Sequence, residues 1–218
     1  MARNSSAVLD RDPELSPESP DPSCCNAKAK ARPRERIVAT AREMFHAQGF
    51  RPVGVEAIAE AAGTNKMTLY RHFGSKDELI VECLRSVFEE GEALWRALEE
   101  RHRGDPRGQL TAWIREKADY VLTDCRGCTM ANAAVEIAEA DHPARRFIEE
   151  RKAAYRVRLT ALCAAAGAAQ AELLADALFL LLEGARVTRQ MGGIADPHAK
   201  FLQTAEAMIG AFTESRPM

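Results

Sequence analysis

The chain has 218 residues and a mass of 24.0 kDa, a length that suits one large helical domain or a small domain joined to a larger one. Hydrophobic residues make up 46% and charged residues 28%, the balance of a soluble globular protein. The sequence contains no run of about eighteen apolar residues, which excludes an ordinary membrane-spanning helix. The N-terminus, MARNSSAVLD, lacks the apolar segment of a secretory signal, so we expect a cytoplasmic protein.

The formal net charge of −2 is unevenly distributed. Residues 28–82 carry ten Lys and Arg against seven Asp and Glu, whereas the segments on either side are acidic. A weakly basic module in an acidic protein is typical of a DNA-binding head on a larger body. An excess of three charges over this length is equally compatible with ordinary scatter, so charge alone leaves both interpretations open.

Residues 1–27 contain four prolines and few large apolar residues. This composition predicts a disordered tail. From Pro33 onward the pattern is helical, with capping residues at most boundaries, and no strand is predicted. We therefore predict an all-α fold of about nine helices, near residues 33–48, 55–62, 66–73, 76–101, 106–124, 129–139, 143–166, 170–190 and 197–213.

The second and third of these helices are short and are joined by a tight turn that contains Gly63. This arrangement is typical of a helix-turn-helix, whose second helix can enter a major groove. Helical spacing places Leu69 and Phe73 on the buried side of that second helix and turns Met67, Thr68 and Arg71 outward. Such outward side chains can contact base edges and phosphates; the alternative is an ordinary solvated polar face.

The stretch from Gly49 to Leu79 resembles the DNA-binding head of the TetR family of bacterial transcriptional regulators. Three motifs, A-x-A-A-G, T-L-Y-x-H-F and x-S-K-x-E-L, stand in that family's order and spacing within GFRPVGVEAIAEAAGTNKMTLYRHFGSKDEL. The resemblance implies a helix-turn-helix domain at residues 28–80 and a ligand-binding and dimerisation domain at residues 81–218. It also implies that Thr68, Tyr70 and His72 contact operator DNA and that Lys76 contacts a phosphate.

From the helix faces and the resemblance together, we predict that seven residues contact DNA: Lys66, Met67, Thr68, Tyr70, Arg71, His72 and Lys76. Two residues depart from the family pattern. Gly54 stands where a Ser or Thr N-cap is usual, and Met67 stands where a smaller residue is common, so the base-reading surface is bulkier. Glu56 can accept a hydrogen bond from the amino group of a cytosine. The helix dipole alone also accounts for a glutamate in the first turn of this helix.

The last two helices carry broad apolar faces, and the resemblance implies that they form the contact between two copies. Our candidates for this homodimer interface are Leu178, Leu182, Phe201, Ala205, Met208 and Phe212. The alternative is that these residues belong to the internal core of one chain.

The resemblance also implies a small-molecule pocket between the middle helices. Our candidates for ligand contact are Trp95, Trp113, Tyr120, Asn132, Glu136 and Tyr155, with Met130, Phe147 and Arg186 as further possibilities. Asn132 and Glu136 stand four apart on a mostly apolar helix, so they need polar partners, which a ligand or a neighbouring helix can supply.

The six cysteines are scattered and do not suggest a disulfide framework. Cys125 and Cys128 flank Arg126, which suggests a redox-responsive thiol pair; the alternative is a loop thiol and a small buried one. No second C-x-x-C or paired His supports zinc, and we predict no metal or cofactor.

These observations favour a regulator that binds double-stranded operator DNA as a homodimer and responds to an unknown small molecule, most simply as a repressor. A redox-sensing regulator on the same scaffold is the alternative. An enzyme is disfavoured because the sequence contains no phosphate loop, nucleophile elbow or metal pair.

Overall fold

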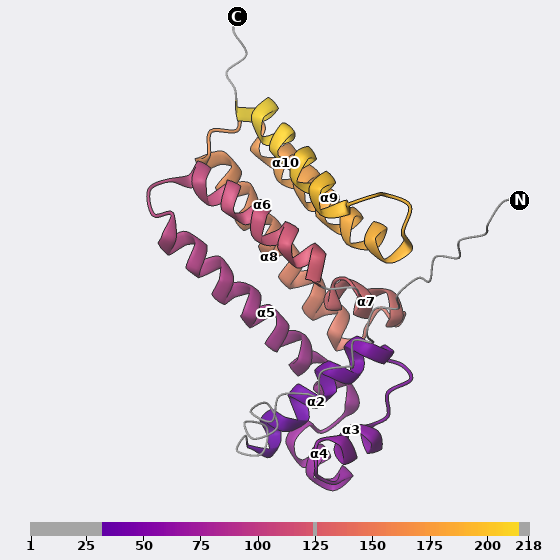
Figure 1. Ribbon diagram of the computed structural model, residues 1–218. Helices are drawn as coiled ribbons and strands as arrows, with labels where there is room; N and C mark the ends of the chain where they lie inside the picture. The colour runs from indigo at the N-terminus through magenta and orange to yellow at the C-terminus, as the bar shows by residue number, and fades with distance from the viewer. Residues whose placement is uncertain (1–31, 124–125, 214–218) are drawn as a thin grey trace, which may run out of the picture. The chain divides into compact units, whose positions relative to one another are not determined.

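The computed structural model describes residues 32–123 and 126–213, and the predicted tail at residues 1–27 lies outside them (Figure 1). The described residues form nine α-helices and no strand, which confirms the all-α prediction. None of these helices combines the length and apolar character needed to cross a membrane. The helices are α2 (Pro33–Gln48), α3 (Val55–Ala61), α4 (Lys66–Phe73), α5 (Lys76–Arg101), α6 (Pro106–Thr123), α7 (Thr129–Glu136), α8 (Pro143–Ala165), α9 (Ala171–Met191) and α10 (Pro197–Thr213).

Most helices begin where a side chain can satisfy the first free backbone amides. The Asn65 side chain accepts from the Thr68 amide at 2.9 Å, and the Ser75 hydroxyl accepts from the Glu78 amide at 3.0 Å. Gly54 gives α3 no side-chain cap, as its identity predicted. Equivalent caps start α6, α8 and α10, from Asp105, His142 and Asp196.

Helix α7 ends three residues earlier than the predicted 129–139. Its C-cap, Ile137, has an extended backbone, and the Arg145 guanidinium donates to the carbonyl oxygens of Ala134 at 3.1 Å and Ile137 at 3.2 Å. A side chain from α8 thus satisfies carbonyls that a longer helix would have bonded itself. Sequence periodicity missed this because Arg145 is nine residues beyond the helix end.

Two hydrophobic cores hold the helices together. The first joins α2, α3, α4 and the start of α5 to α7 and the start of α8, and the second fills the space between the end of α5 and helices α6, α8, α9 and α10. Helix α5 contributes Leu84 to the first core and Trp95 to the second. The predicted domain boundary at residue 80 therefore falls within a continuous helix, and the division into residues 28–80 and 81–218 stays a prediction.

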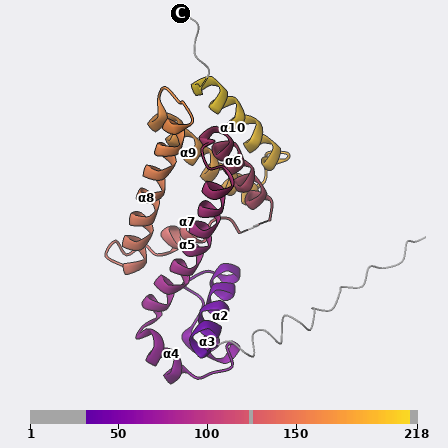
Figure 2. The same ribbon diagram turned by 90° about the vertical axis from the view of Figure 1, so that its left-hand side faces the viewer.

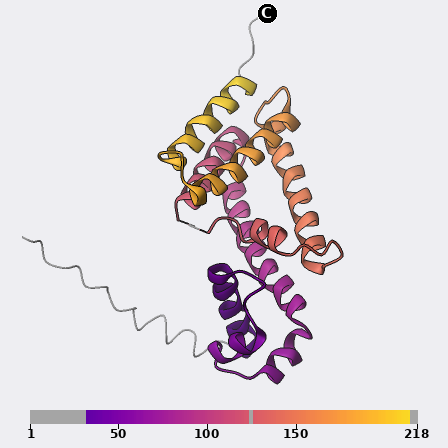
Figure 3. The ribbon, with the colours of Figure 1, turned by 90° about the vertical axis from the view of Figure 1, so that its right-hand side faces the viewer.

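Figures 2 and 3 show α5 continuing from the short helices α2–α4 into the bundle formed by α6, α8, α9 and α10. Helix α8 packs against both α5 and α9, and α10 packs against α6 and α9. Helix α7 packs on α5 and α8, and its buried residues belong to the core of the short helices. This helix therefore shares a core with α2–α4 and also packs on the bundle helix α8.

Candidate functional site

Helix α4 is fixed by a turn before it and by two buried anchors. Gly63, in the turn after α3, has φ of +64°, a conformation that an L side chain rarely adopts. Leu69 is fully buried and Phe73 is 4% exposed, which confirms the predicted buried face of this helix. The position and rotation of α4 are therefore set by packing rather than by a ligand.

The opposite face of α4 is open to solvent. Met67 is 77% exposed, Arg71 and His72 are also exposed, and Thr68 and Tyr70 are half-buried at the edges of the face. Among the large apolar side chains of the described residues, only Val135 is more exposed than Met67. The face thus offers a thioether, a guanidinium, an imidazole and two hydroxyls in one short helix.

Lys66 is engaged with two neighbours in the structure. Its ammonium pairs with the Glu56 carboxylate of α3 and lies 5.7 Å from the centroid of the Tyr70 ring. The ion pair lowers the pKa of Glu56 and raises the pKa of Lys66, and both groups stay charged. Because both side chains are exposed, a phosphate can replace the carboxylate at little cost.

Lys76 stands in the first turn of α5, where a cation opposes the helix dipole. Its ammonium donates to the Arg51 carbonyl oxygen at 3.2 Å, and partial burial lowers its pKa. This bond ties the start of α5 to the loop that precedes α3.

A cavity of about 110 Å³ lies within the bundle, between α5, α6, α8, α9 and the residues around the start of α7. Its apolar lining includes Phe88, Met130, Phe179 and Leu182. Six charged side chains also line it, which are Glu92, Lys117, Arg151, Lys152, Glu183 and Arg186.

Of the predicted ligand contacts, Tyr155 lines this cavity and the two tryptophans lie behind it. The Trp113 indole donates to the Tyr155 hydroxyl at 2.7 Å, and the Trp95 ring meets the Tyr155 ring edge-on at 5.5 Å between centroids. Burial raises the pKa of Tyr155. The tryptophans therefore orient Tyr155 from the core, while Tyr120 lies under the Arg186 guanidinium, 5.1 Å from it.

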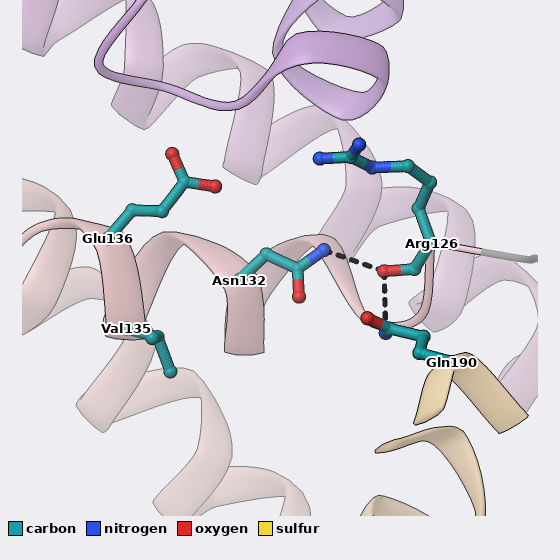
Figure 4. Close-up of a pocket in the computed structure, with 5 residues that line it drawn as sticks. All are labelled: Arg126, Asn132, Val135, Glu136 and Gln190. Carbon is teal, nitrogen blue, oxygen red and sulfur yellow. Dashed lines mark hydrogen bonds between the residues drawn. The ribbon is translucent and has the colours of Figure 1, made fainter. Parts of the chain in front are cut away.

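Asn132 and Glu136 lie elsewhere, in a second, more open pocket of about 470 Å³ beside α7 (Figure 4). The Asn132 amide donates to the Arg126 carbonyl oxygen at 2.7 Å, and Gln190 donates to the same oxygen at 2.8 Å. The Glu136 carboxylate accepts from the Phe50 amide at 2.6 Å. The polar partners of this pair are thus neighbouring segments of the chain.

Comparison with known proteins relates the chain to a family. Residues 37–83 match the family model described as bacterial regulatory proteins, tetR family. The fold is similar to that of a TetR-family transcriptional regulator from Streptomyces coelicolor, with a TM-score of 0.77 and 27% sequence identity over 84% of this chain and 96% of the other. Over residues 37–83 the chain thus carries the TetR-family domain, and most of its length is similar in fold to a TetR-family regulator.

Curated relatives support the same family over shorter stretches. The transcriptional regulator TcmR of Streptomyces glaucescens is 38% identical over 74 residues, 34% of this chain and 31% of TcmR. The transcriptional activator FasR of Mycolicibacterium smegmatis is 32% identical over 111 residues, 49% of this chain and 50% of FasR. The chain thus matches at most half the length of these two relatives.

Four of the six predicted dimer residues are buried within the single chain. Leu178, Leu182, Phe201 and Ala205 are 2% exposed or less, because they fill the core between α9 and the rest of the bundle. Their burial within one chain supports the alternative of an internal core, and their role in a dimer contact stays a prediction. Met208 and Phe212 are half-buried against the same core.

The exposed apolar residues of α9 lie on its other face. Leu173, Leu180 and Val187 repeat every seven residues and are 53%, 70% and 49% exposed. Met191, the last residue of α9, continues this stripe at 75%, and Ile194 in the segment after the helix is 52% exposed. The heptad spacing was readable in the sequence, but both faces of α9 are apolar, and periodicity alone could not show which of them the bundle covers.

The predicted thiol pair is described in part. Cys125 lies outside the described residues, and Cys128 is half-buried beside the cavity, with its sulfur 4.0 Å from the Lys152 ammonium. A redox role for the pair stays a prediction.

Most charged residues of the cavity were missed by sequence reasoning. Lys117 follows Trp113 by four residues and Ile114 by three, so it stands on the buried face of α6. A lysine on such a face was the available signal, since charged residues there need a reason. Arg151 and Lys152 gave no such signal, because they stand in a charged stretch of sequence. Glu183 directly follows the apolar run LFLLL, so its position was a further available signal.

Proposed function

We propose that this protein is a TetR-family transcriptional repressor that binds a near-palindromic operator as a homodimer and releases it when a small molecule binds the body. The observation that carries the proposal is the α4 face. Its exposed Met67, Arg71 and His72 stand on a short helix that Leu69 and Phe73 fix to the core. A recognition helix needs exposed side chains that can reach the DNA and a buried side that holds the helix in a fixed position.

The side chains divide by the contact that each can make. Arg71 can bond a guanine edge with two donors, and Thr68 can touch a thymine methyl group. Lys66, Tyr70, His72 and Lys76 suit the phosphate backbone, which supplies affinity without sequence preference. Met67 adds apolar surface where the family pattern has a smaller residue, so it distinguishes this protein's preferred site.

A dimer supports specific recognition, because one head contacts too few base pairs. The exposed stripe of α9, defined by Leu173, Leu180, Val187 and Met191, is the surface that we assign to the contact between copies. Contiguous exposed apolar residues on a helix are typical of an interaction surface. Small residues on the exposed side of α10, such as Ala199, Ala207 and Ala211, permit a second helix to approach closely.

Ligand in the cavity can act on the heads through α7. Met130 lines the cavity from the first turn of α7, and Glu136 at the other end of that helix accepts from the Phe50 amide. The Arg51 side chain donates to the Glu136 carbonyl oxygen at 2.8 Å. A shift of α7 would therefore move the loop before α3 and change the population of DNA-competent head spacings.

The experiment is capture of genomic DNA fragments by the purified protein, followed by gel-shift titration of one captured fragment. We expect the Arg71→Ala/Lys76→Ala variant to lose most of its affinity, since each lost contact costs about 1–3 kcal/mol. Arg96→Ala/Arg103→Ala removes two exposed charges from the bundle and serves as the control. Unchanged affinity in the first variant would overturn the proposal.

The alternatives make different predictions in the same assay. A redox sensor would release its fragment on oxidation and lose that response in Cys128→Ser, whereas equal affinity of oxidised and reduced protein would exclude it. Transcription of a reporter behind the captured promoter tells repression from activation. A protein that regulates transcription by binding DNA acts in the cytoplasm of a bacterium, and DNA binding of this kind requires no catalytic group.

A further inference from the structure

The bundle cavity carries more positive than negative charge. Four of its lining side chains are cations, Lys117, Arg151, Lys152 and Arg186, and two are carboxylates, Glu92 and Glu183. The remainder of the lining is largely apolar. A cavity of this kind within a helical bundle is unusual, because buried cations cost free energy unless anions accompany them.

Both carboxylates are already engaged. Glu183 pairs with Lys152 and also with Arg186, whose terminal nitrogen lies 3.0 Å from it. Glu92 pairs with Arg158 at 2.9 Å, and Arg158 is not among the lining residues. The cavity's own acids therefore cannot neutralise Lys117 as well.

Lys117 has no carboxylate in contact with it among the described residues. The nearest aromatic contact of its ammonium is the Tyr155 ring, at 5.9 Å from the centroid. Burial, followed by repulsion from Arg186, lowers the pKa of Lys117 to about 8. The fold thus holds this cation in an environment that disfavours its charge.

Arg186 offers a second unused donor at the cavity. Its side chain is only 10% exposed, and its Nε is buried without a hydrogen-bond partner. The Nε of Arg151 is also buried without a partner, while its guanidinium lies 5.1 Å from the Phe88 ring and 4.0 Å from the exposed Glu150. Buried donors without acceptors are rare in native proteins and point to a missing partner.

We propose that this cavity binds a small organic anion whose carboxylate accepts from Lys117 and Arg186. Its short aliphatic remainder packs against Phe88, Met130 and Phe179. The size follows from the cavity, since an apolar cavity of about 150 Å³ holds a benzene ring and this one is smaller. The inference deepens the proposed function by giving the chemical class of the effector, and it rests on that function only for the effect on DNA.

Binding is tested without DNA by calorimetric titration of the full chain with butyrate, butyramide and butylammonium. These probes have nearly the same size and differ in charge. We expect butyrate to bind and the neutral and cationic probes to bind at least about tenfold more weakly, because a hydrogen bond between charged groups contributes roughly 1.5–3 kcal/mol. Equal affinity for all three probes, or no heat with butyrate at tens of millimolar, would overturn the inference.

Two variants tie the binding to the named side chain. Lys117→Met keeps an unbranched apolar side chain, one atom shorter, and removes the charge, so we expect it to weaken butyrate binding by about tenfold or more. Arg96→Gln removes one exposed charge from α5 and should leave the affinity unchanged. Thermal unfolding of both variants controls for folding. Unchanged butyrate affinity in folded Lys117→Met would contradict the assignment.

The DNA assay separates this inference from the proposed function. If butyrate binds in a Lys117-dependent manner and also releases the captured fragment, both stand. If it binds in that manner and leaves DNA affinity unchanged, the anion site stands and the effector part of the proposed function fails.

Discussion

Lys117 shows how a single residue can link folding to binding. Its neighbours hold it in a half-buried site on α6 where solvent cannot fully stabilise the ammonium. The cost is borne by the folded state only, because the unfolded chain hydrates this side chain completely. Charged groups that lower the stability of the fold in this way are common at binding sites, where a ligand stabilises the charge in place of the lost water.

Replacement of Lys117 by Met should therefore stabilise the free protein, by on the order of 2 kcal/mol at neutral pH. Below pH 8 the lysine is charged in both the folded and the unfolded state, and the folded state carries the full cost. Between pH 8 and about 10 the folded state releases its proton first, so the unfolded state binds more protons and wild-type stability rises with pH.

The stability difference between the two proteins should thus be largest below pH 8 and shrink above it, in urea unfolding followed by circular dichroism. The Tyr155 pKa is raised by burial, so that side chain does not titrate in this window. Other charged or titratable groups that face Lys117 or line the cavity are Glu116 on its own helix, Glu92 on α5, Arg151 and Lys152 on α8, Glu183 and Arg186 on α9, and Cys128. A difference that stays constant across this range would contradict the burial argument.

Among the elements, α7 has the contacts of a coupling helix. Its C-terminal end holds the loop before α3 through two bonds, from the Phe50 amide to the Glu136 carboxylate and from the Arg51 side chain to the Glu136 carbonyl oxygen. Phe50 is 2% exposed, so its amide has no water to replace a lost acceptor.

Glu136→Ala should lower the free energy of unfolding by about 1–3 kcal/mol, because it leaves the Phe50 amide without a partner. Glu139→Ala is the matched control: its ion pair with Arg51 joins two exposed side chains at 3.3 Å and contributes at most about 0.5 kcal/mol. Urea unfolding measures both effects, and hydrogen exchange at the Phe50 amide should accelerate in Glu136→Ala alone. Equal behaviour of the two variants would show that α7 does not hold this loop.

The helices were largely predictable from sequence because their starts depend on local chemistry. Asn65 and Ser75 cap their helices within three residues of themselves, so the signal and its effect lie together in the chain. The end of α7 depends on Arg145, and the Glu136 bond spans 86 residues. The cavity draws its lining from four long helices and the start of α7, and only tertiary packing brings Lys117 to Arg186. Position within a helix was therefore predictable, whereas the partner of each side chain was not.

At the scale of the whole molecule, the proposed dimer needs a surface that the single chain leaves uncovered. The α9 stripe repeats every seven residues over three positions, and its exposed side chains are too large and too apolar to be explained by solvent contact alone. The core residues Leu178 and Leu182 on the opposite side of α9 already anchor this helix in the bundle. The stripe can therefore be altered without opening the core of the chain.

Leu180→Glu should convert the dimer to monomers by placing a charge at the centre of the stripe, with the dimer dissociation constant raised by about 30-fold or more. Affinity for the captured DNA fragment should fall with it, because a monomer engages only one half-site. Val157→Glu, at a residue of α8 that is 66% exposed and outside the stripe, is the matched control. Sedimentation velocity at micromolar concentration measures the association, and thermal unfolding shows whether each variant is folded. A wild-type monomer would refute the dimer, and a Leu180→Glu dimer as stable as the wild type would move the interface to another surface.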